Sequence, residues 1–165
     1  KCGFGLNTGL AVVGNMGSDQ RFDYSVLGDI VNLAARLEGQ SKFYDVDIVI
    51  GAETCAQVPD LATIELDLIQ VKGKTVGVKI FALLGDEAIE KAGDFRTLRD
   101  NHQQMIATYR AQEWDIAKAR LKECRILCEP FGLNQLYGLY EARITEYEAN
   151  PPAPNWDCVY VATNK

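Results

Sequence analysis

Two hydrophobic periodicities divide the chain near residue 85. Before that point, short apolar stretches alternate with turns, and the run at 64–68 (IELDL) alternates strictly between apolar and acidic residues. A spacing of two is typical of a strand with one buried face. The pattern predicts a loop over 18–27 and strands at about 3–7, 10–14, 46–50, 64–68 and 78–84, of which the first two form a hairpin.

One amphipathic helix interrupts this strand-rich part. From Asp29 onward, apolar residues recur every three or four positions, and Gly39 stands where such a helix could end. A shorter helix is expected over 52–58, before Pro59. Residues 1–85 are therefore predicted to form a mixed α/β (α+β) domain.

After residue 86 the spacing of apolar residues is helical throughout. We expect one helix over 95–113, a second capped by Asp115, and a third that starts near Leu133 and ends at Asn150. These helices resemble a single tetratricopeptide-type unit, whereas a true array needs at least three repeats. Residues 86–165 are thus expected to form an all-α, tetratricopeptide-like extension with an aromatic tail at 156–161.

The composition excludes several classes of protein. The chain has 17 Lys and Arg against 23 Asp and Glu, a formal net charge of −6. Binding of nucleic acid without sequence preference needs a basic face, so we expect no nucleic-acid partner. Five widely spread cysteines argue against a disulfide scaffold and favour a reducing compartment. Because the chain has a single histidine, the sequence argues against most types of histidine-containing metal site and against a Ser-His-Asp triad.

Three further candidate features have simpler explanations. Cys124 and Cys128 lie four residues apart on an expected helix, but no second ligand pair accompanies them, so packing as small apolar side chains is the better interpretation. His102 has polar neighbours and is expected on a solvated helix face. The glycine-rich segments 3–8, 14–17 and 73–75 look like phosphate-binding loops but lack the required spacing.

The polar residues Asn32 and Arg36 are the most informative pair. They lie four positions apart on the helix expected from Asp29, so both side chains can address one ligand. Arginine suits planar, bidentate recognition of phosphate. The alternative is a solvated helix surface on which Arg36 pairs with a carboxylate of a neighbouring element.

Four motifs in order give the chain a family resemblance. The segments 5–9 (GLNTG), 14–17 (GNMG), 28–38 (GDIVNLAARLE) and 71–74 (VKGK) closely resemble the C-terminal half of class III nucleotide cyclase catalytic domains, bacterial adenylate cyclases especially. The resemblance covers residues 3–84. It implies a ferredoxin-like fold, a head-to-tail homodimer with active sites at its interface, and conversion of ATP to cyclic AMP and pyrophosphate.

The resemblance also implies roles for single residues. Asn32 orients the ribose, and Arg36 stabilises charge on the α-phosphate while the 3′-hydroxyl attacks. Lys72 contacts the terminal phosphate, with Lys74 as the alternative. Ser25 falls where the family reads the purine and favours adenine, although a hydroxyl can donate or accept a hydrogen bond.

Two departures from the family pattern matter. Leu10 replaces the proline usual after Asn-Thr-Gly. The aspartates that bind Mg²⁺ or Mn²⁺ in the family belong to its N-terminal half, which would precede Lys1, so we expect this chain to be a fragment, inactive by itself. Its sheet is expected to expose apolar residues unless the helical half covers them: Val12, Ile48, Val49 and Ile80.

The rest of the interpretation concerns the cellular context. The helical half resembles, more weakly, the tail of some membrane-anchored bacterial cyclases, which implies a cytoplasmic catalytic domain in a parent protein with a membrane anchor. The rival interpretation is a non-catalytic cyclase-homology module that dimerises and binds a protein partner through the helical tail. The presence of both Asn32 and Arg36 favours the enzyme, because a structural relic has no need of that pair.

Overall fold

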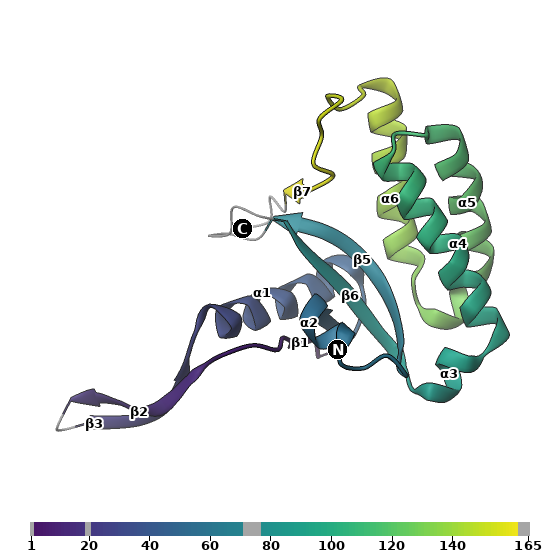
Figure 1. Ribbon diagram of the computed structural model, residues 1–165. Coiled ribbons are helices and arrows are strands. Elements are labelled where there is room, and N and C mark those ends of the chain that lie inside the picture. The colour runs from purple at the N-terminus through teal and green to yellow at the C-terminus, as the bar shows by residue number, and fades with distance from the viewer. Residues whose placement is uncertain (1, 19–20, 71–76, 162–165) are drawn as a thin grey trace.

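The computed structural model describes residues 2–18, 21–70 and 77–161, and it has a mixed α+β architecture. A five-stranded sheet has the order β1-β4-β6-β5-β7, with parallel pairs at its two ends and antiparallel pairs between them. Strands β2 (Val12–Ser18) and β3 (Arg21–Leu27) form a separate antiparallel ribbon. This ribbon projects away from the rest of the molecule (Figure 1).

The predicted hairpin between the first two strands is wrong. Strand β1 (Phe4–Leu6) pairs in parallel with β4 (Ile48–Gly51), whereas β2 pairs with β3. The region 18–27, predicted as a loop, contains β3. Its alternation of Phe22, Tyr24 and Val26 with polar residues was a strand signal that the high polar content of the segment concealed.

Helix α1 (Asp29–Tyr44) packs against β1 and β4. It continues past Gly39 and ends only where Asp45 adopts a left-handed conformation, with φ of 55°. Leu37 and Tyr44 are fully buried, and this packing outweighs the weak helix propensity of one glycine. The short helix α2 (Ala52–Ala56) follows β4, as expected.

The predicted strands at 64–68 and 78–84 are confirmed as β5 (Ala62–Gln70) and β6 (Val78–Gly85). The strict alternation expected for β5 is interrupted, because the pairing register with β6 shifts between Glu65 and Asp67. At such a bulge two consecutive side chains oppose one residue of the partner strand. Leu66 and Asp67 are therefore both buried, although alternation alone would place Asp67 with the polar face.

The helical half contains three long helices preceded by a short one. They are α3 (Glu87–Lys91), α4 (Gly93–Arg110), α5 (Trp114–Leu127) and α6 (Asn134–Ala149), with a 3₁₀ turn (Glu129–Phe131) before α6. Asp115 lies in the first turn of α5 and does not cap it. The two-residue strand β7 (Tyr160–Val161) returns to pair with β5. In Figure 1, helices α4, α5 and α6 lie to the right of β5, and α1 lies to its left.

Buried residues of both halves form one continuous hydrophobic core. Helix α1 and the helical half together enclose this core, in which Val49 and Ile80 are fully buried. Ile48 is partly buried, whereas Val12 on the ribbon stays exposed. Cys124 and Cys128 are buried within this core, in keeping with a packing role. None of the helices in the described ranges combines the length and the apolar character needed to cross a bilayer.

Candidate functional site

Gly28 forms the junction between the ribbon and helix α1. Its φ of 154° lies in a region that side chains disfavour, and a Cβ atom there would stand 3.3 Å from the carbonyl oxygen of Leu10. The Gly28 carbonyl accepts hydrogen bonds from the amides of Val31 and Asn32, at 3.1 and 3.3 Å, and so starts the helix. The glycine of the GDIVN motif therefore fixes where α1 begins.

The GLNTG segment positions α1 from the other side. A Cβ atom on Gly5 would lie 2.9 Å from Cα of Glu38 and closer still to the carbonyl oxygen of Ala34. The Asn7 side-chain amide donates a hydrogen bond of 3.2 Å to the carbonyl of Ile30, in the first turn of α1. Gly5 therefore allows the backbones of β1 and α1 to approach each other closely.

Asn32 and Arg36 lie one turn apart on α1. The Asn32 side chain is exposed and that of Arg36 is partly buried. Within the ranges that the structure describes, neither side chain has a hydrogen-bond or ion-pair partner, so the alternative of Arg36 paired with a neighbouring carboxylate is not observed there. A cation and an amide on one helix face, both without partners among the described residues, are available to a ligand.

Of the other predicted site residues, Ser25 falls within the described ranges. Ser25 is on β3, opposite Gly14 of β2, and is partly buried between the exposed side chains of Tyr24 and Val26. The structure thus places Ser25 on the strand that leads into α1. Lys72 and its alternative Lys74 lie outside the described residues.

The described residues do not fit a divalent cation. No group of three or more His, Cys, Asp or Glu within them comes close enough together to hold a metal ion. Mg²⁺ prefers carboxylate oxygens arranged as an octahedron with water. The predicted Mg²⁺ or Mn²⁺ therefore stays a prediction.

The comparison with known families covers this whole region. Residues 2–85 match the model of the adenylate and guanylate cyclase catalytic domain. The chain belongs to this family. The matched range contains Ser25, Asn32, Arg36 and Lys72, and it ends where β6 ends.

The extent of similarity to individual relatives varies. Adenylate cyclase 1 of Rhizobium meliloti is 36% identical over 83 residues, which cover 50% of this chain and 12% of the relative. The adenylate cyclase of Anabaena cylindrica is 35% identical over 83 residues, covering 48% and 16%. The crystal structure of the adenylyl cyclase CyaB from P. aeruginosa matches with a TM-score of 0.44 and 36% identity, over 50% of this chain and 41% of that one. The matched part therefore spans only a small share of these curated relatives.

A buried polar network joins the cyclase half to the helical half. Asp67 of β5, only 2% exposed, accepts hydrogen bonds at Oδ2 from the Tyr44 hydroxyl (2.7 Å) and from Nη1 of Arg143 (2.5 Å). Burial and the neighbouring Asp67 carboxylate raise the pKa of Tyr44 above its ordinary value. Burial by itself would lower the pKa of Arg143, but the charge of Asp67 raises it.

Sequence reasoning missed this network. Asp67 and Arg143 are far apart in the sequence, and the bulge that buries Asp67 left no periodic signal. In the regular alternation of 64–68, Asp67 looked like an ordinary solvent-facing position.

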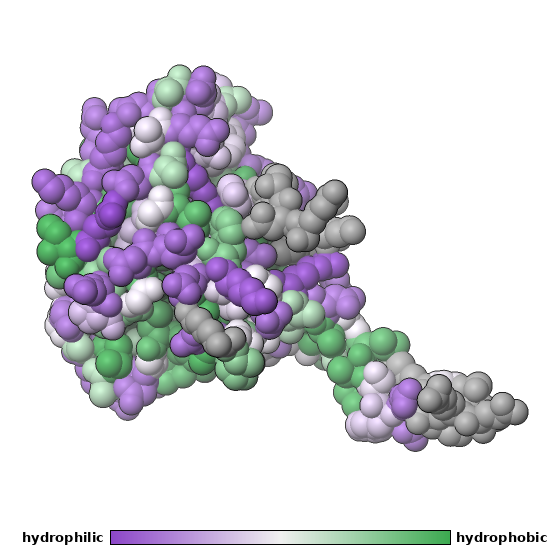
Figure 2. All heavy atoms as spheres, turned by 180° about the vertical axis from the view of Figure 1, so that it is seen from behind, coloured by the Kyte–Doolittle hydropathy of each residue, from purple (hydrophilic) through white to green (hydrophobic). Residues whose placement is uncertain are grey.

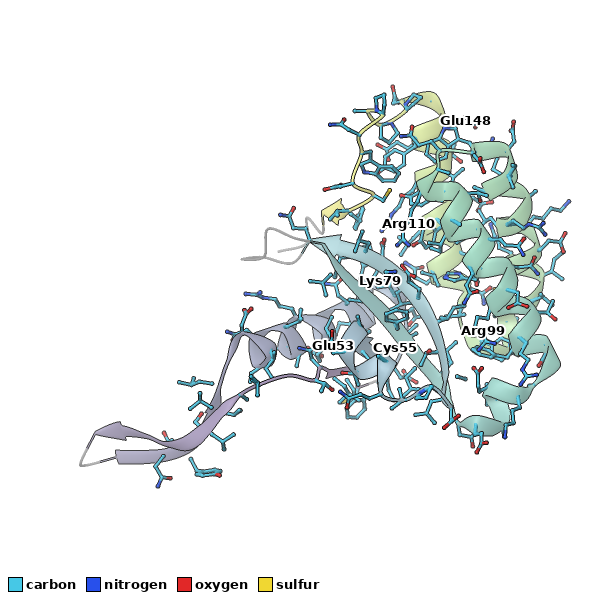
Figure 3. All side chains as sticks on the ribbon, in the orientation of Figure 1. Glu53, Cys55, Lys79, Arg99, Arg110 and Glu148 are labelled. Atoms are coloured by element: carbon cyan, nitrogen blue, oxygen red, sulfur yellow. The ribbon has the colours of Figure 1, made fainter. Side chains whose placement is uncertain are left out.

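His102 was also predicted wrongly, as an exposed residue. It is fully buried between α4, β5 and α6, where its Nε2 donates to the carbonyl of Glu65 (2.6 Å) and its Nδ1 accepts from the Tyr137 hydroxyl (3.2 Å). Arg110, labelled in Figure 3, reaches from α4 to the Glu65 carboxylate at 2.6 Å. Burial lowers the pKa of His102 to about 4, so the ring is neutral near pH 7. The polar residues next to His102 in the sequence face away from the core, so they gave no indication that His102 itself is buried.

Proposed function

We propose that residues 1–85 form part of an adenylate cyclase catalytic domain and supply Asn32 and Arg36 to the conversion of ATP into cyclic AMP and pyrophosphate. One observation carries this proposal. The two side chains lie a turn apart on α1, without protein partners in the described ranges, inside the segment that matches the family.

The reaction requires charge stabilisation and orientation of the substrate, which Arg36 and Asn32 can provide. The ribose 3′-oxygen attacks the α-phosphorus, the bond to pyrophosphate breaks, and the hydroxyl proton leaves. Negative charge on the α-phosphate oxygens changes during the transfer, and the Arg36 guanidinium stabilises it. The Asn32 amide holds the ribose so that its oxygen faces the phosphorus. Lys72 neutralises the terminal phosphate, with Lys74 next in the same turn, and no covalent intermediate with the protein is needed.

The purine is read in part by Ser25. The resemblance of this position to the purine-reading position of the family favours adenine, and the Ser25 hydroxyl can accept from the adenine amino group, so we assign ATP as the substrate. In the native protein, by which we mean the polypeptide that carries these 165 residues in the cell, kcat/KM should be higher for ATP than for GTP. A preference for GTP would remove this role from Ser25.

Two copies of the domain build the site. The ribbon of β2 and β3 exposes apolar side chains, among them Val12, which is 68% exposed, and Tyr24, which is 77% exposed. Figure 2 shows hydrophobic residues gathered at the root of this projecting ribbon. An exposed apolar surface on an isolated two-stranded ribbon is typical of a protein interface. We therefore place the ribbon against a second copy, in the cytoplasm where ATP is available, with any Mg²⁺ or Mn²⁺ held by residues outside the described ones.

The test is cyclic AMP formation from ATP by the native protein. Arg36→Ala should lower kcat about a hundredfold, the effect of losing one preorganised charge donor, with a smaller change in nucleotide affinity. Arg125→Ala is the matched control, because that arginine is exposed on α5 and pairs with the exposed Glu141. Equal turnover by wild type and Arg36→Ala would remove Arg36 from the mechanism. Absence of cyclic AMP from the wild type would overturn the proposed activity.

A further inference from the structure

The last turn of α1 is held by the helical half of the chain. Tyr44 ends α1, Asp67 lies on β5, Arg143 lies on α6 and Tyr160 lies on β7; these four residues are called the Asp67 network below. One carboxylate oxygen of Asp67 accepts from both Tyr44 and Arg143. The other accepts from the amide of Leu68 at 2.8 Å. The network therefore connects α6, through Asp67 of β5, to the end of the helix that carries Asn32 and Arg36.

Tyr160 strengthens the same connection from the C-terminal strand. The Arg143 guanidinium lies 3.6 Å from the centroid of the Tyr160 ring, within the range of a cation–π interaction. The Tyr160 ring also stacks on Phe43 of α1, with centroids 6.0 Å apart and an interplanar angle of 23°. Strand β7 holds Tyr160 in place because it pairs with β5 at Ile69. Tyr160 of β7 thus contacts the final turn of α1, and Arg143 of α6 is linked to that turn through Asp67.

The geometry of α1 transmits a displacement from one end to the other. Tyr44 follows Arg36 by eight residues, about 12 Å along a rigid helix. The first turn is held by Gly28 and Asn7, and the last turn by the Asp67 network. The middle of the helix rests on Gly5, which packs against Ala34 and Glu38. If the last turn shifts, the helix tilts about these contacts and the orientation of the Arg36 side chain changes. A misplacement of about 1 Å can cost about a hundredfold in rate.

The network is not built for stability alone. Burying an ion pair costs desolvation, and well-packed apolar residues at such positions are often as stable or more so. Arg143 also leaves Nη2 buried without a hydrogen-bond partner in the described part of the chain. The network instead contributes a defined geometry. The donors Tyr44 of α1 and Arg143 of α6 meet at one oxygen of Asp67, and this fixes the position of α1 relative to α6.

We propose that the helical half positions α1 for catalysis through the Asp67 network, so that Tyr44, Asp67 and Arg143 are positioning residues for Asn32 and Arg36. This inference rests on the proposed function for the roles of Asn32 and Arg36. It gives the helical half, which the family match does not reach, a part in the activity of the cyclase half.

The experiment compares three variants of the native protein with one control. Arg143→Met removes the charge at similar length, Arg143→Lys keeps the charge, and Tyr44→Phe removes only a hydroxyl. Arg125→Met is the control, an ion-paired arginine of the same helical half outside the network. Thermal melts first establish a temperature at which every variant is folded. Amide hydrogen exchange over residues 37–44 and the values of kcat and KM for ATP are then measured at that temperature.

We expect exchange over residues 37–44 to rise at least tenfold in Arg143→Met and to stay unchanged in Arg125→Met. We expect kcat to fall about tenfold in Arg143→Met and less in Tyr44→Phe, with KM within about twofold of wild type. Arg143→Lys should recover part of kcat. A purely structural role would leave kcat unchanged in every folded variant.

The outcomes separate this inference from the proposed function. If the wild type is active and folded Tyr44→Phe and Arg143→Met keep its kcat, positioning is overturned while the cyclase function stands. If Arg143→Met does not fold, Tyr44→Phe decides by the same criterion. If the wild type makes no cyclic AMP, the proposed function fails, and positioning for catalysis fails with it. The exchange data would then show only whether α6 holds α1.

Discussion

Gly5 and Glu38 are packed so closely that no side chain fits between them: a Cβ atom on Gly5 would lie 2.9 Å from Cα of Glu38. Two sequence motifs are joined by this contact. The GLNTG segment supplies β1, and the GDIVNLAARLE segment supplies α1, with Arg36 between the two points, Ala34 and Glu38, that Gly5 approaches. The glycine serves the site through the placement of α1.

The first prediction concerns this contact. Gly5→Ala should lower the free energy of unfolding by about 1–3 kcal/mol, because the added methyl group meets backbone atoms that cannot rotate away. Gly39→Ala is the matched control: it lies within α1 with open space around it, and should raise stability by about 0.5–1 kcal/mol. Urea denaturation measures both. A Gly5→Ala variant as stable as wild type would show that β1 and α1 can separate without cost.

The second prediction concerns the pair on α1. Asn32→Ala and Arg36→Ala should each lower kcat about a hundredfold in the native protein. The double variant should lose less than the product of the two single losses, because both side chains act on one transition state. The measurement is a double-mutant cycle on cyclic AMP formation. Full additivity would mean that the two residues act independently.

Local features of this site could be predicted from the sequence, and long-range ones could not. Asn32 and Arg36 share a helix face because of their spacing alone. Strands β5 and β6 followed from alternation of apolar residues. The pairing of β1 with β4 depends instead on a partner more than 40 positions away, and two adjacent strands falsely suggested a hairpin.

The Asp67 network shows the same limit. A bulge reverses the alternation within β5, and only the folded chain brings Arg143 of α6 to the buried carboxylate. The prediction that His102 is exposed failed for a related reason, since its environment is formed by Glu65 and Tyr137 from other elements. Neither environment is encoded by neighbours in the sequence.

The third prediction concerns pH. His102 has a pKa of about 4 in the folded chain and an ordinary value of 6.5, so between these values the unfolded chain binds a proton that the folded chain does not. This group therefore makes stability fall as pH decreases from about 6.5 to about 4. Between about pH 7 and pH 5 its contribution is roughly 2 kcal/mol.

The matched variant for this prediction is His102→Gln, whose amide can donate to the Glu65 carbonyl but does not titrate. Other groups titrate equally in both proteins, so the difference between wild type and variant isolates His102. Denaturation midpoints at the two pH values give that difference. The same pH dependence in wild type and variant would contradict the assignment of a neutral, buried His102.

The fourth prediction concerns self-association through the ribbon. Val12 on β2 and Ile126 on α5 are both 68% exposed. The two positions therefore have the same solvent accessibility but lie on different parts of the molecule, the ribbon and the helical half. A charge buried in an apolar interface costs desolvation without a partner, whereas a charge facing water costs little. Val12→Glu should therefore weaken the dimer of the native protein at least tenfold, and Ile126→Glu should leave it unchanged. Sedimentation velocity over a concentration series measures the dissociation constant. A larger effect of Ile126→Glu would move the interface to the helical half, and an unaffected dimer in Val12→Glu would remove the ribbon from it.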